Sequence, residues 1–340
     1  MKGFSIPDKR SDRVVLEANT RYWDRSRFPR LKRIIFDNTM SQKDAVELVK
    51  TGDGRVDLVT GLSPLETLRV AQSSFAKVVK NRKSTVTVLG LLNMRKAESP
   101  WQDIRLRRAV NLAINRGDLI TYAANGNGVI VPALVPAEGF GYPVDLAPYP
   151  FDPDKSRELV RDAGYGAGLP VTLIAPPDLA TQATVIGKML EQVGLSVESQ
   201  ILDANAFNRA TILSDANQRG EQERWDIALI SNVSWADFPP FDHYETVALD
   251  GNRVFAVEQP GLRTLRDRTL RTADRDRQQG LIREMERHVS EHAYFLFLYQ
   301  PVDLAAVNKA VEYVPYPTFL MLAESSVTDQ HWSVRRAVRK

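Results

Sequence analysis

The sequence of 340 residues contains no cysteine. A disulfide framework, a thiolate metal site and a cysteine nucleophile are therefore excluded. Long apolar runs are also missing. The longest, around 86–92 and 294–299, fall far short of the roughly 20 residues that a membrane-spanning helix requires. We therefore expect no segment that spans a bilayer.

The overall composition is that of an ordinary folded protein, with 43% hydrophobic and 26% charged residues. Such a chain can bury a large core, and its length favours about two domains. The composition also excludes collagen-like, fibrous and wholly disordered classes.

The charge is unevenly distributed along the chain. The net charge is +3 and the isoelectric point is near 9.0, but residues 1–40 carry a positive surplus of 5 and the last ten residues carry four further bases. The body between them, residues 41–330, is acidic at −6. We therefore interpret the basic ends as solvated surface and expect no nucleic-acid partner. Residues 1–12 have the charges that begin a signal peptide, but no apolar stretch follows, so we expect no secretion signal in this chain.

The first ninety residues alternate between short strands and short helices. Ser41, with Asp44 three residues later, predicts the start of a helix over Ser41–Lys50, and Ser63-Pro64 predicts the start of a second helix. Runs rich in β-branched residues predict strands. These are Val14–Glu17, Leu31–Phe36, Val56–Val59 and the long run Val78–Leu92.

After residue 100 the pattern is that of an α/β protein. Amphipathic spacing predicts helices over Trp101–Asn115 and Asp118–Ala124, and six prolines exclude regular structure over 131–153. Helices and strands then alternate at the spacing that crossover connections require. They are expected at Asp154–Ala163, Val171–Ala175, Leu179–Val193, Ser196–Leu202, Ala204–Leu213 and Asp226–Ser231, followed by a helical region over 260–292 and a strand over Tyr294–Tyr299.

Four stretches, taken together, resemble one known family. They are Arg13–Trp23 (RVVLEANTRYW), Leu91–Arg116 (LLNMRKAESPWQDIRLRRAVNLAINR), Tyr149–Tyr165 (YPFDPDKSRELVRDAGY) and Gly187–Glu198 (GKMLEQVGLSVE). Each is similar to a segment that recurs, in this order, in the family 5 extracellular solute-binding proteins, the peptide- and nickel-type receptors of bacterial ABC importers.

The resemblance implies an α/β fold with two lobes, of the type II periplasmic-binding-protein class. Lobe I would comprise residues 1–92 and a return segment with a C-terminal tail, 299–340, and lobe II would be the continuous α/β region 93–298. In typical members the counterpart of Arg13–Trp23 lies well inside the mature protein. We therefore expect an incomplete lobe I and a truncated or divergent member of the family.

The candidate ligand site is the string Ser231–Pro240 (SNVSWADFPP), which follows a buried-looking strand. Loops at the ends of α/β strands are where such folds bind ligands. Trp235 can supply an apolar wall, Asp237 can accept a bond from a cation, and Asn232 and Ser234 add polar groups. The resemblance implies that Asp237 pairs with the amino terminus of a peptide. Alternatively, Asp237 caps a turn ahead of two prolines and Trp235 is a core residue.

The resemblance also guides the expected ligand and partners. Dipeptide-type members have an arginine in the loop after the first strand of lobe II, whereas here that loop reads Pro176–Gln182 (PPDLATQ). We therefore expect a longer peptide or another small polar or cationic solute. The chain would be a monomer without enzymatic activity or cofactor. It would act in the periplasm or outside the cell, delivering its ligand to an inner-membrane ABC permease.

Two other functions stay open at this stage. His288, Glu291 and His292 form the H-x-x-E-H pattern of some zinc peptidases, with Glu312 or Glu324 as a third ligand. The chain would then be a zinc-dependent hydrolase. The second alternative is a remnant that does not bind ligand, in which a folded lobe II acts as an interaction module.

Overall fold

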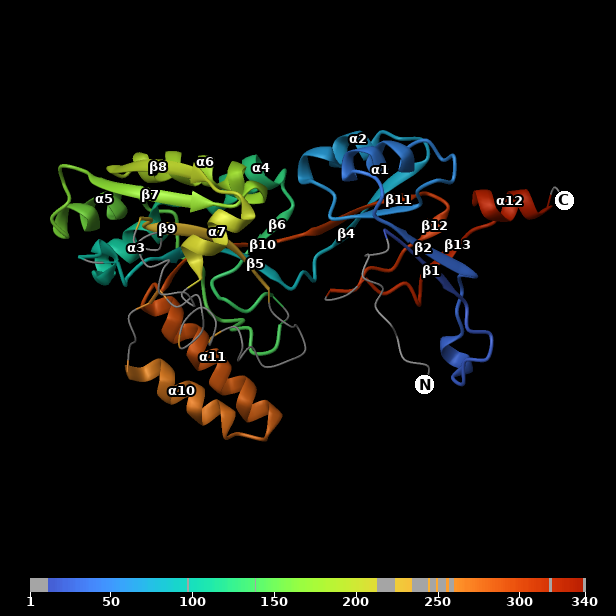
Figure 1. Ribbon diagram of the computed structural model, residues 1–340. Coiled ribbons are helices and arrows are strands. Elements are labelled where there is room, and N and C mark those ends of the chain that lie inside the picture. The colour runs from blue at the N-terminus through green and yellow to red at the C-terminus, as the bar shows by residue number, and fades with distance from the viewer. Residues whose placement is uncertain are drawn as a thin grey trace. The chain divides into compact units, whose positions relative to one another are not determined.

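The computed structural model describes residues 12–96, 98–137, 139–212, 224–233, 244, 249, 255–256, 260–317 and 320–338. The chain divides into two compact units (Figure 1). Unit 1 comprises Met1–Asn81 and Asp303–Lys340, and unit 2 comprises Arg82–Val302. Unit 1 is discontinuous along the chain and unit 2 is continuous, and the crossings between them lie at 81/82 and 302/303, whereas the lobe boundaries expected from the sequence were 92/93 and 298/299.

The shift of the first crossing has a local cause. The expected single strand Val78–Leu92 is wrong, because the region forms two strands, β4 (Ala76–Asn81) and β5 (Val86–Leu92), in different sheets. Ser84 interrupts them, since its Oγ accepts a hydrogen bond from the Val86 amide at 3.2 Å. Such local bonds compete with a sheet ladder. β5 then pairs along its whole length with a strand of unit 2.

Unit 1 is built around a three-stranded antiparallel sheet, with β11 (Asp303–Asn308) between β3 (Leu58–Thr60) and β4. Ser41 begins helix α1 (Gln42–Val49) as expected, because its side chain accepts from the Asp44 amide. The unit's other elements are β1 (Arg13–Glu17), η1 (Arg25–Arg27), β2 (Arg33–Asp37), η2 (Pro64–Glu66), α2 (Thr67–Ala71), β12 (Val311–Glu312), β13 (Ser326–Val327) and α12 (Trp332–Val338).

Unit 2 contains a six-stranded sheet of mixed direction. Its order is β6-β10-β5-β9-β7-β8. The strand β7 runs parallel to both β8 and β9, whereas β5, β6, β9 and β10 pair as antiparallel neighbours. Only β7, β8 and β9 therefore show the parallel pairing that crossover connections produce, and the rest of the sheet is antiparallel. The strand bounds are β6 Gly128–Ile130, β7 Leu169–Ala175, β8 Leu195–Ile201, β9 Ile227–Val233 and β10 Phe295–Pro301.

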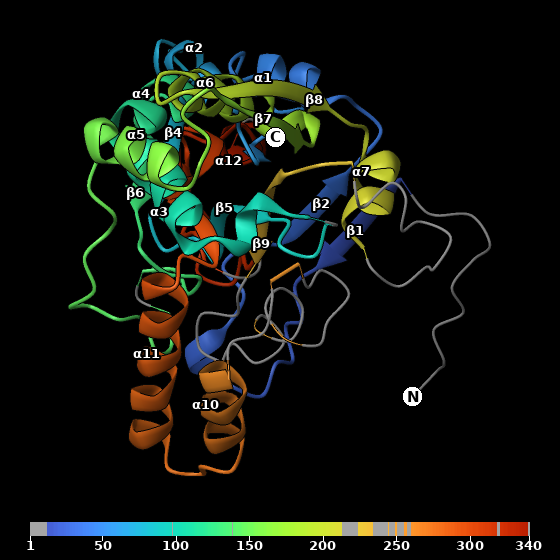
Figure 2. The ribbon, with the colours of Figure 1, turned by 90° about the vertical axis from the view of Figure 1, so that its left-hand side faces the viewer.

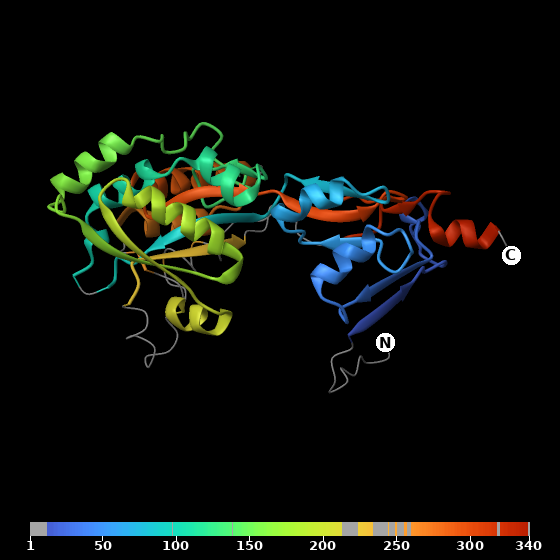
Figure 3. The same ribbon diagram turned by 90° about the horizontal axis from the view of Figure 1, so that it is seen from above.

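The helices of unit 2 cover this sheet. Figure 3 shows α6 lying along β7 and β8. The region expected to be helical over 260–292 forms two helices, which lie side by side in Figure 2. Asp274 caps the start of the second helix, because its side chain accepts a hydrogen bond from the Arg277 amide at 2.8 Å. The bounds are η3 Pro100–Gln102, α3 Ile104–Ala113, α4 Arg116–Ala124, α5 Pro153–Asp162, η4 Pro177–Leu179, α6 Ala180–Glu191, α7 Ala204–Thr211, α10 Pro260–Leu270 and α11 Arg275–Glu291.

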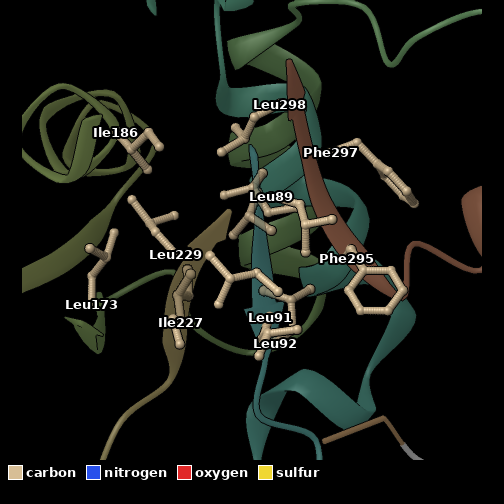
Figure 4. Packing of buried hydrophobic residues seen from close by; sticks show 14 of the residues in the cluster. Leu89, Leu91, Leu92, Leu173, Ile186, Ile227, Leu229, Phe295, Phe297 and Leu298 are labelled. Carbon is tan, nitrogen blue, oxygen red and sulfur yellow. The ribbon is translucent and has the colours of Figure 1, made fainter. Parts of the chain in front are cut away.

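The core of unit 2 lies around the central strands. In Figure 4, Leu89 of β5, Leu229 of β9 and Ile186 of α6 belong to one buried cluster with residues of β7 and β10. The central strand β5 is buried from its second residue to its last, which explains why its sequence lacks the alternation typical of a half-exposed strand. None of the helices in the described ranges is long and apolar enough to cross a membrane.

We expect Leu229→Ala to lower the free energy of unfolding of unit 2 by about 2–5 kcal/mol, because it leaves a cavity in a close-packed core. The matched control is Val144→Ala, since Val144 is 81% exposed and Leu229 is 0% exposed. Urea unfolding followed by circular dichroism measures both variants. Equal midpoints for the two would contradict this placement of the core.

Candidate functional site

The strand β9 contains the first three residues of the candidate ligand string 231–240, and side chains form hydrogen bonds at both ends of this strand. Before β9, the buried Asp226 accepts hydrogen bonds from Lys96 Nζ at 2.9 Å and from the Thr172 amide at 2.9 Å. Near the other end, Asn232 lies opposite Thr87 of β5, and its Nδ2 donates to Thr87 Oγ1 at 3.3 Å. Both ends of β9 are therefore held by hydrogen bonds to neighbouring parts of unit 2.

The structure describes only one of the four predicted site residues, Asn232. Asn232 is 7% exposed, in β9. The other three, Ser234, Trp235 and Asp237, lie outside the described residues. Their assignment stays a prediction, as does the role of Asn232 in binding.

A buried carboxylate lies at the centre of a polar network that includes Thr87, the partner of Asn232. Glu286 of α11 is 0% exposed and accepts a hydrogen bond from Tyr244 Oη on one oxygen. Its other oxygen accepts from the Leu134 amide at 2.7 Å. The carbonyl of Leu134 in turn accepts from Thr87 Oγ1 at 3.0 Å. The network therefore joins Asn232, which precedes the string 234–240, to Tyr244, which follows it.

The segment 131–142 is held against α11 by apolar packing as well. Val135 and Phe140 form a buried cluster with Ile282, one turn before Glu286 on the same helix. Gly141, at φ +87°, completes the contact, because a side chain there would collide with Ile282. This packing places the Leu134 amide where it can bond to Glu286.

Burial controls the protonation of this network. Removal from water raises the pKa of Glu286 to about 7, against the opposing effect of hydrogen bonds from Tyr244 and from the amides of Leu134 and Val135. Burial and the nearby Glu286 also raise the pKa of Tyr244 and of Tyr142. Both tyrosines are therefore neutral at neutral pH, and Tyr244 donates its hydroxyl hydrogen bond to Glu286.

A second buried side chain connects the two ends of unit 2. Gln300 of β10 is 0% exposed, and its Nε2 donates to the carbonyls of Arg82 and Ser84, both at 3.0 Å. Its Oε1 accepts from the Ala137 amide at 2.7 Å. Unit 2 begins at Arg82 and ends at Val302. The Gln300 side chain therefore joins the first residues of this unit to its last strand by hydrogen bonds.

The zinc interpretation finds no support in the structure. The rings of His288 and His292 stack at a centroid distance of 4.2 Å, and His292 Nδ1 lies 2.8 Å from the carbonyl oxygen of His288. Burial and the neighbouring His292 both lower the pKa of His288. Within the described residues, no three His, Asp or Glu side chains are grouped so that they could hold a metal ion.

Unit 1 has a cavity of its own that the sequence did not predict. Its volume is about 270 Å³, and Phe75, Trp332, Lys309 and Arg335 are among its lining residues. Trp332 is fixed beside it, because its Nε1 donates to Asp57 Oδ1 at 3.1 Å. Asn308 Nδ2 donates to the same oxygen of Asp57 at 3.1 Å.

Sequence reasoning also missed Glu286, although a signal was present. Glu286 shares the inward face of α11 with Ile282, four residues earlier, and Val289, three residues later. An acidic residue at an apolar position of an amphipathic helix indicates a buried, hydrogen-bonded carboxylate. The charged surface of the helix, rich in Arg and Asp, obscured this position.

We expect Glu286→Gln to flatten the pH dependence of unfolding. The folded pKa of about 7 lies above the ordinary value of 4.5. The stabilisation from this group is therefore fully present below about pH 4.5 and is lost as the pH rises through 7, a change of about 3 kcal/mol. Glutamine keeps the shape of the neutral acid. Urea unfolding of unit 2 between pH 4.5 and 8 measures the difference.

The control for this experiment is Glu284→Gln on the same helix, because Glu284 is exposed and lies away from Glu286's buried partners. This variant should retain the pH profile of the wild type. A wild-type profile in Glu286→Gln as well would show that Glu286 does not titrate as described.

Comparison with known proteins finds relatives among bacterial binding proteins. It is 25% identical over 332 residues to the glutathione-binding protein GsiB of Pectobacterium atrosepticum, a match that covers 94% of this chain and 62% of that protein. The chain thus spans less than two thirds of the length of this relative.

Solved structures show the same fold. The ABC transporter substrate-binding protein CtaP of Listeria monocytogenes matches with a TM-score of 0.81 at 17% identity, covering 94% of this chain and 65% of CtaP. The periplasmic binding protein DppA of Helicobacter pylori, in complex with the peptide STSA, matches with a TM-score of 0.72 at 19% identity. That match covers 94% of this chain and 61% of DppA. The α/β, two-lobed, type II periplasmic-binding-protein-like fold that we expected is therefore confirmed.

The middle region of one protein family matches residues 8–252, most of the chain. The match includes all four stretches on which the resemblance depended, and it also includes the string 231–240. The chain therefore belongs to the bacterial extracellular solute-binding proteins, family 5.

Proposed function

We propose that this chain is the substrate-binding component of an ABC importer. It would bind a peptide or a similar small solute and deliver it to an inner-membrane permease, in the periplasm or outside the cell. The observation that carries this proposal is the family match over residues 8–252, which includes the candidate ligand loop. The names of similar proteins support a ligand of this class, since one is a glutathione-binding protein and another was solved with a peptide.

The proposed ligand site is the loop that follows β9. Asp237 would accept a charge-assisted hydrogen bond from the amino terminus of the ligand, and Trp235 would provide an apolar wall. Ser234 and Asn232 would supply further polar contacts. Enclosing the carboxylate without such a partner would cost on the order of 3–5 kcal/mol, so ligand binding and enclosure of the site would be coupled.

Hydrogen bonds of the described residues on either side of the string 234–240 support this choice of site. Asn232 bonds to Thr87, and Tyr244 bonds to Glu286. Both are linked through Leu134, whose carbonyl accepts from Thr87 and whose amide donates to Glu286. A binding loop gains precision when its two ends are fixed by buried hydrogen bonds. The two units would act as the two lobes.

The sequence of the loop after β7 limits the class of ligand that we propose. It contains η4 and the start of α6, and its Gln182 donates to Tyr299 Oη at 2.9 Å. The stretch Pro176–Gln182 has no arginine to hold a peptide carboxylate at a fixed distance. We therefore propose a ligand longer than a dipeptide, or another small polar or cationic solute. Binding involves no chemical step, and one site per chain requires only a monomer.

We expect Asp237→Asn to weaken binding of the tetrapeptide Ser-Thr-Ser-Ala by about 10-fold to 100-fold, because a hydrogen bond to a charged group contributes about 1.5–3 kcal/mol. Isothermal titration calorimetry with the free peptide and its N-acetylated form measures the effect. Acetylation should weaken binding to the wild type by a similar factor and should add little to the loss in the variant.

The matched control is Asp145→Asn, since Asp145 is exposed in unit 2 and pairs with Arg287. It should bind the peptide as the wild type does. If Asp237→Asn bound the peptide with the affinity of the wild type, the proposed contact between Asp237 and the ligand would be wrong. An absence of heat with this peptide and with glutathione in the wild type would contradict the proposed function itself.

A further inference from the structure

The cavity in unit 1 is formed by segments that backbone hydrogen bonds hold together. The Lys309 amide donates to the Phe75 carbonyl at 2.7 Å, which joins the turn after β11 to the residue before β4. The Thr328 amide donates to the Ala310 carbonyl at 2.9 Å, which joins the same turn to the residue after β13. All four of these residues line the cavity. The cavity is therefore a built part of the fold.

Two aromatic side chains form apolar walls of this cavity. Phe75 is 51% exposed, so much of its ring is available to a ligand. Trp332 is held in place, because a Cβ atom at Gly54 would lie 2.6 Å from Trp332 Cγ, and the glycine backbone therefore packs directly against the indole ring. The hydrogen bond from Trp332 Nε1 to Asp57 fixes the same ring. A wall that is fixed before binding lowers the entropic cost of binding a ligand.

The charge that lines the cavity is positive. Lys309 and Arg335 are lining residues, and none of the described lining residues is acidic. Lys309 Nζ donates to the Ser73 carbonyl at 2.8 Å, which uses one of the three donors of an ammonium group. Arg335 is exposed, and a guanidinium group presents the planar fork of donors that matches a carboxylate. The cavity therefore favours an anionic ligand group over a neutral or cationic one.

The volume of the cavity limits the size of the ligand. A cavity of about 150 Å³ holds benzene, whereas the volume of this cavity is about 270 Å³. An aromatic ring therefore fits, with room for a short chain that carries a charged group. Sites for drug-sized molecules have volumes of about 300–1,000 Å³. The cavity in unit 1 therefore suits a ligand smaller than a peptide.

We propose that this cavity binds a small aromatic carboxylate. The ring lies against Phe75 and Trp332, and the carboxylate accepts hydrogen bonds from Lys309 Nζ and from the guanidinium group of Arg335. All lining residues belong to unit 1, whereas the loop after β9 belongs to unit 2. The proposal therefore goes beyond the proposed function and does not depend on it.

The test follows the indole N–H signals of the full, ¹⁵N-labelled chain by NMR. The chain has five tryptophans, and the signal that is lost in Trp332→Phe identifies Trp332. The probe is 3-phenylpropionate. We expect it to shift the Trp332 signal in a saturable way, with a dissociation constant on the order of 1 mM, because a ligand of this size makes few contacts.

Two further probes separate the contribution of the charge from that of the ring. The neutral 3-phenylpropionamide keeps the ring and the shape of the acid, and propionate keeps the charge without the ring. Each should bind at least about tenfold more weakly than 3-phenylpropionate, because the amide loses the charge-assisted hydrogen bonds and propionate loses the apolar contacts.

Two variants test the proposed cations. Arg335→Gln and Lys309→Gln should each weaken binding of 3-phenylpropionate about tenfold and leave binding of the neutral amide within about twofold. The matched control is Lys43→Gln, because Lys43 is an exposed cation of α1 in unit 1 that does not line the cavity. Exposed charges outside the site are screened by salt, so this variant should bind the acid within about twofold of the wild type.

Three results would overturn the proposal. If the Trp332 signal showed no saturable shift up to about 20 mM 3-phenylpropionate, the cavity would not bind this class of ligand. Equal affinity of the wild type for the acid and for its amide would show that the cations do not contact the ligand. Unchanged binding in both Arg335→Gln and Lys309→Gln would contradict the assigned carboxylate partners. Circular dichroism of each variant distinguishes loss of binding from loss of fold.

Discussion

The hydrogen bonds of the buried Glu286 carboxylate are the interaction on which the arrangement of three segments of unit 2 depends. It joins α11 to the irregular segment 131–137 through the Leu134 amide, and it joins both to Tyr244. A carboxylate out of contact with water is costly unless its oxygens accept hydrogen bonds. Glu286 therefore constrains three parts of unit 2 that are far apart in sequence, and Thr87 extends the constraint to β5 and β9.

This constraint connects the fold to the proposed function. A receptor that holds a small ligand needs polar groups in fixed positions, and loops carry such groups best when a rigid scaffold supports them. In unit 2 the scaffold is the mixed sheet, and Gln300 and Glu286 supply the buried bonds around it.

Much of the fold could be predicted from local sequence. Ser41 indicated the start of α1, and the prolines of 131–153 excluded regular structure there. The division of 78–92 between two sheets could not be predicted, because strand pairing is a long-range property and β5, buried on both faces, lacks alternation. The burial of Glu286 was indicated by its place on the inward face of α11, but its partners Leu134 and Tyr244 could not be predicted, because they come from distant parts of the sequence. Trp235 and Asp237 were chosen by resemblance and by their place after a strand.

The central claim is that the loop after β9 holds the amino terminus of a peptide. A crystal structure of the full chain with a bound tetrapeptide tests it most directly. The account predicts the ligand's ammonium group within hydrogen-bond distance of the Asp237 carboxylate, with Trp235 against the peptide. A peptide bound elsewhere, with Asp237 facing bulk solvent, would contradict it.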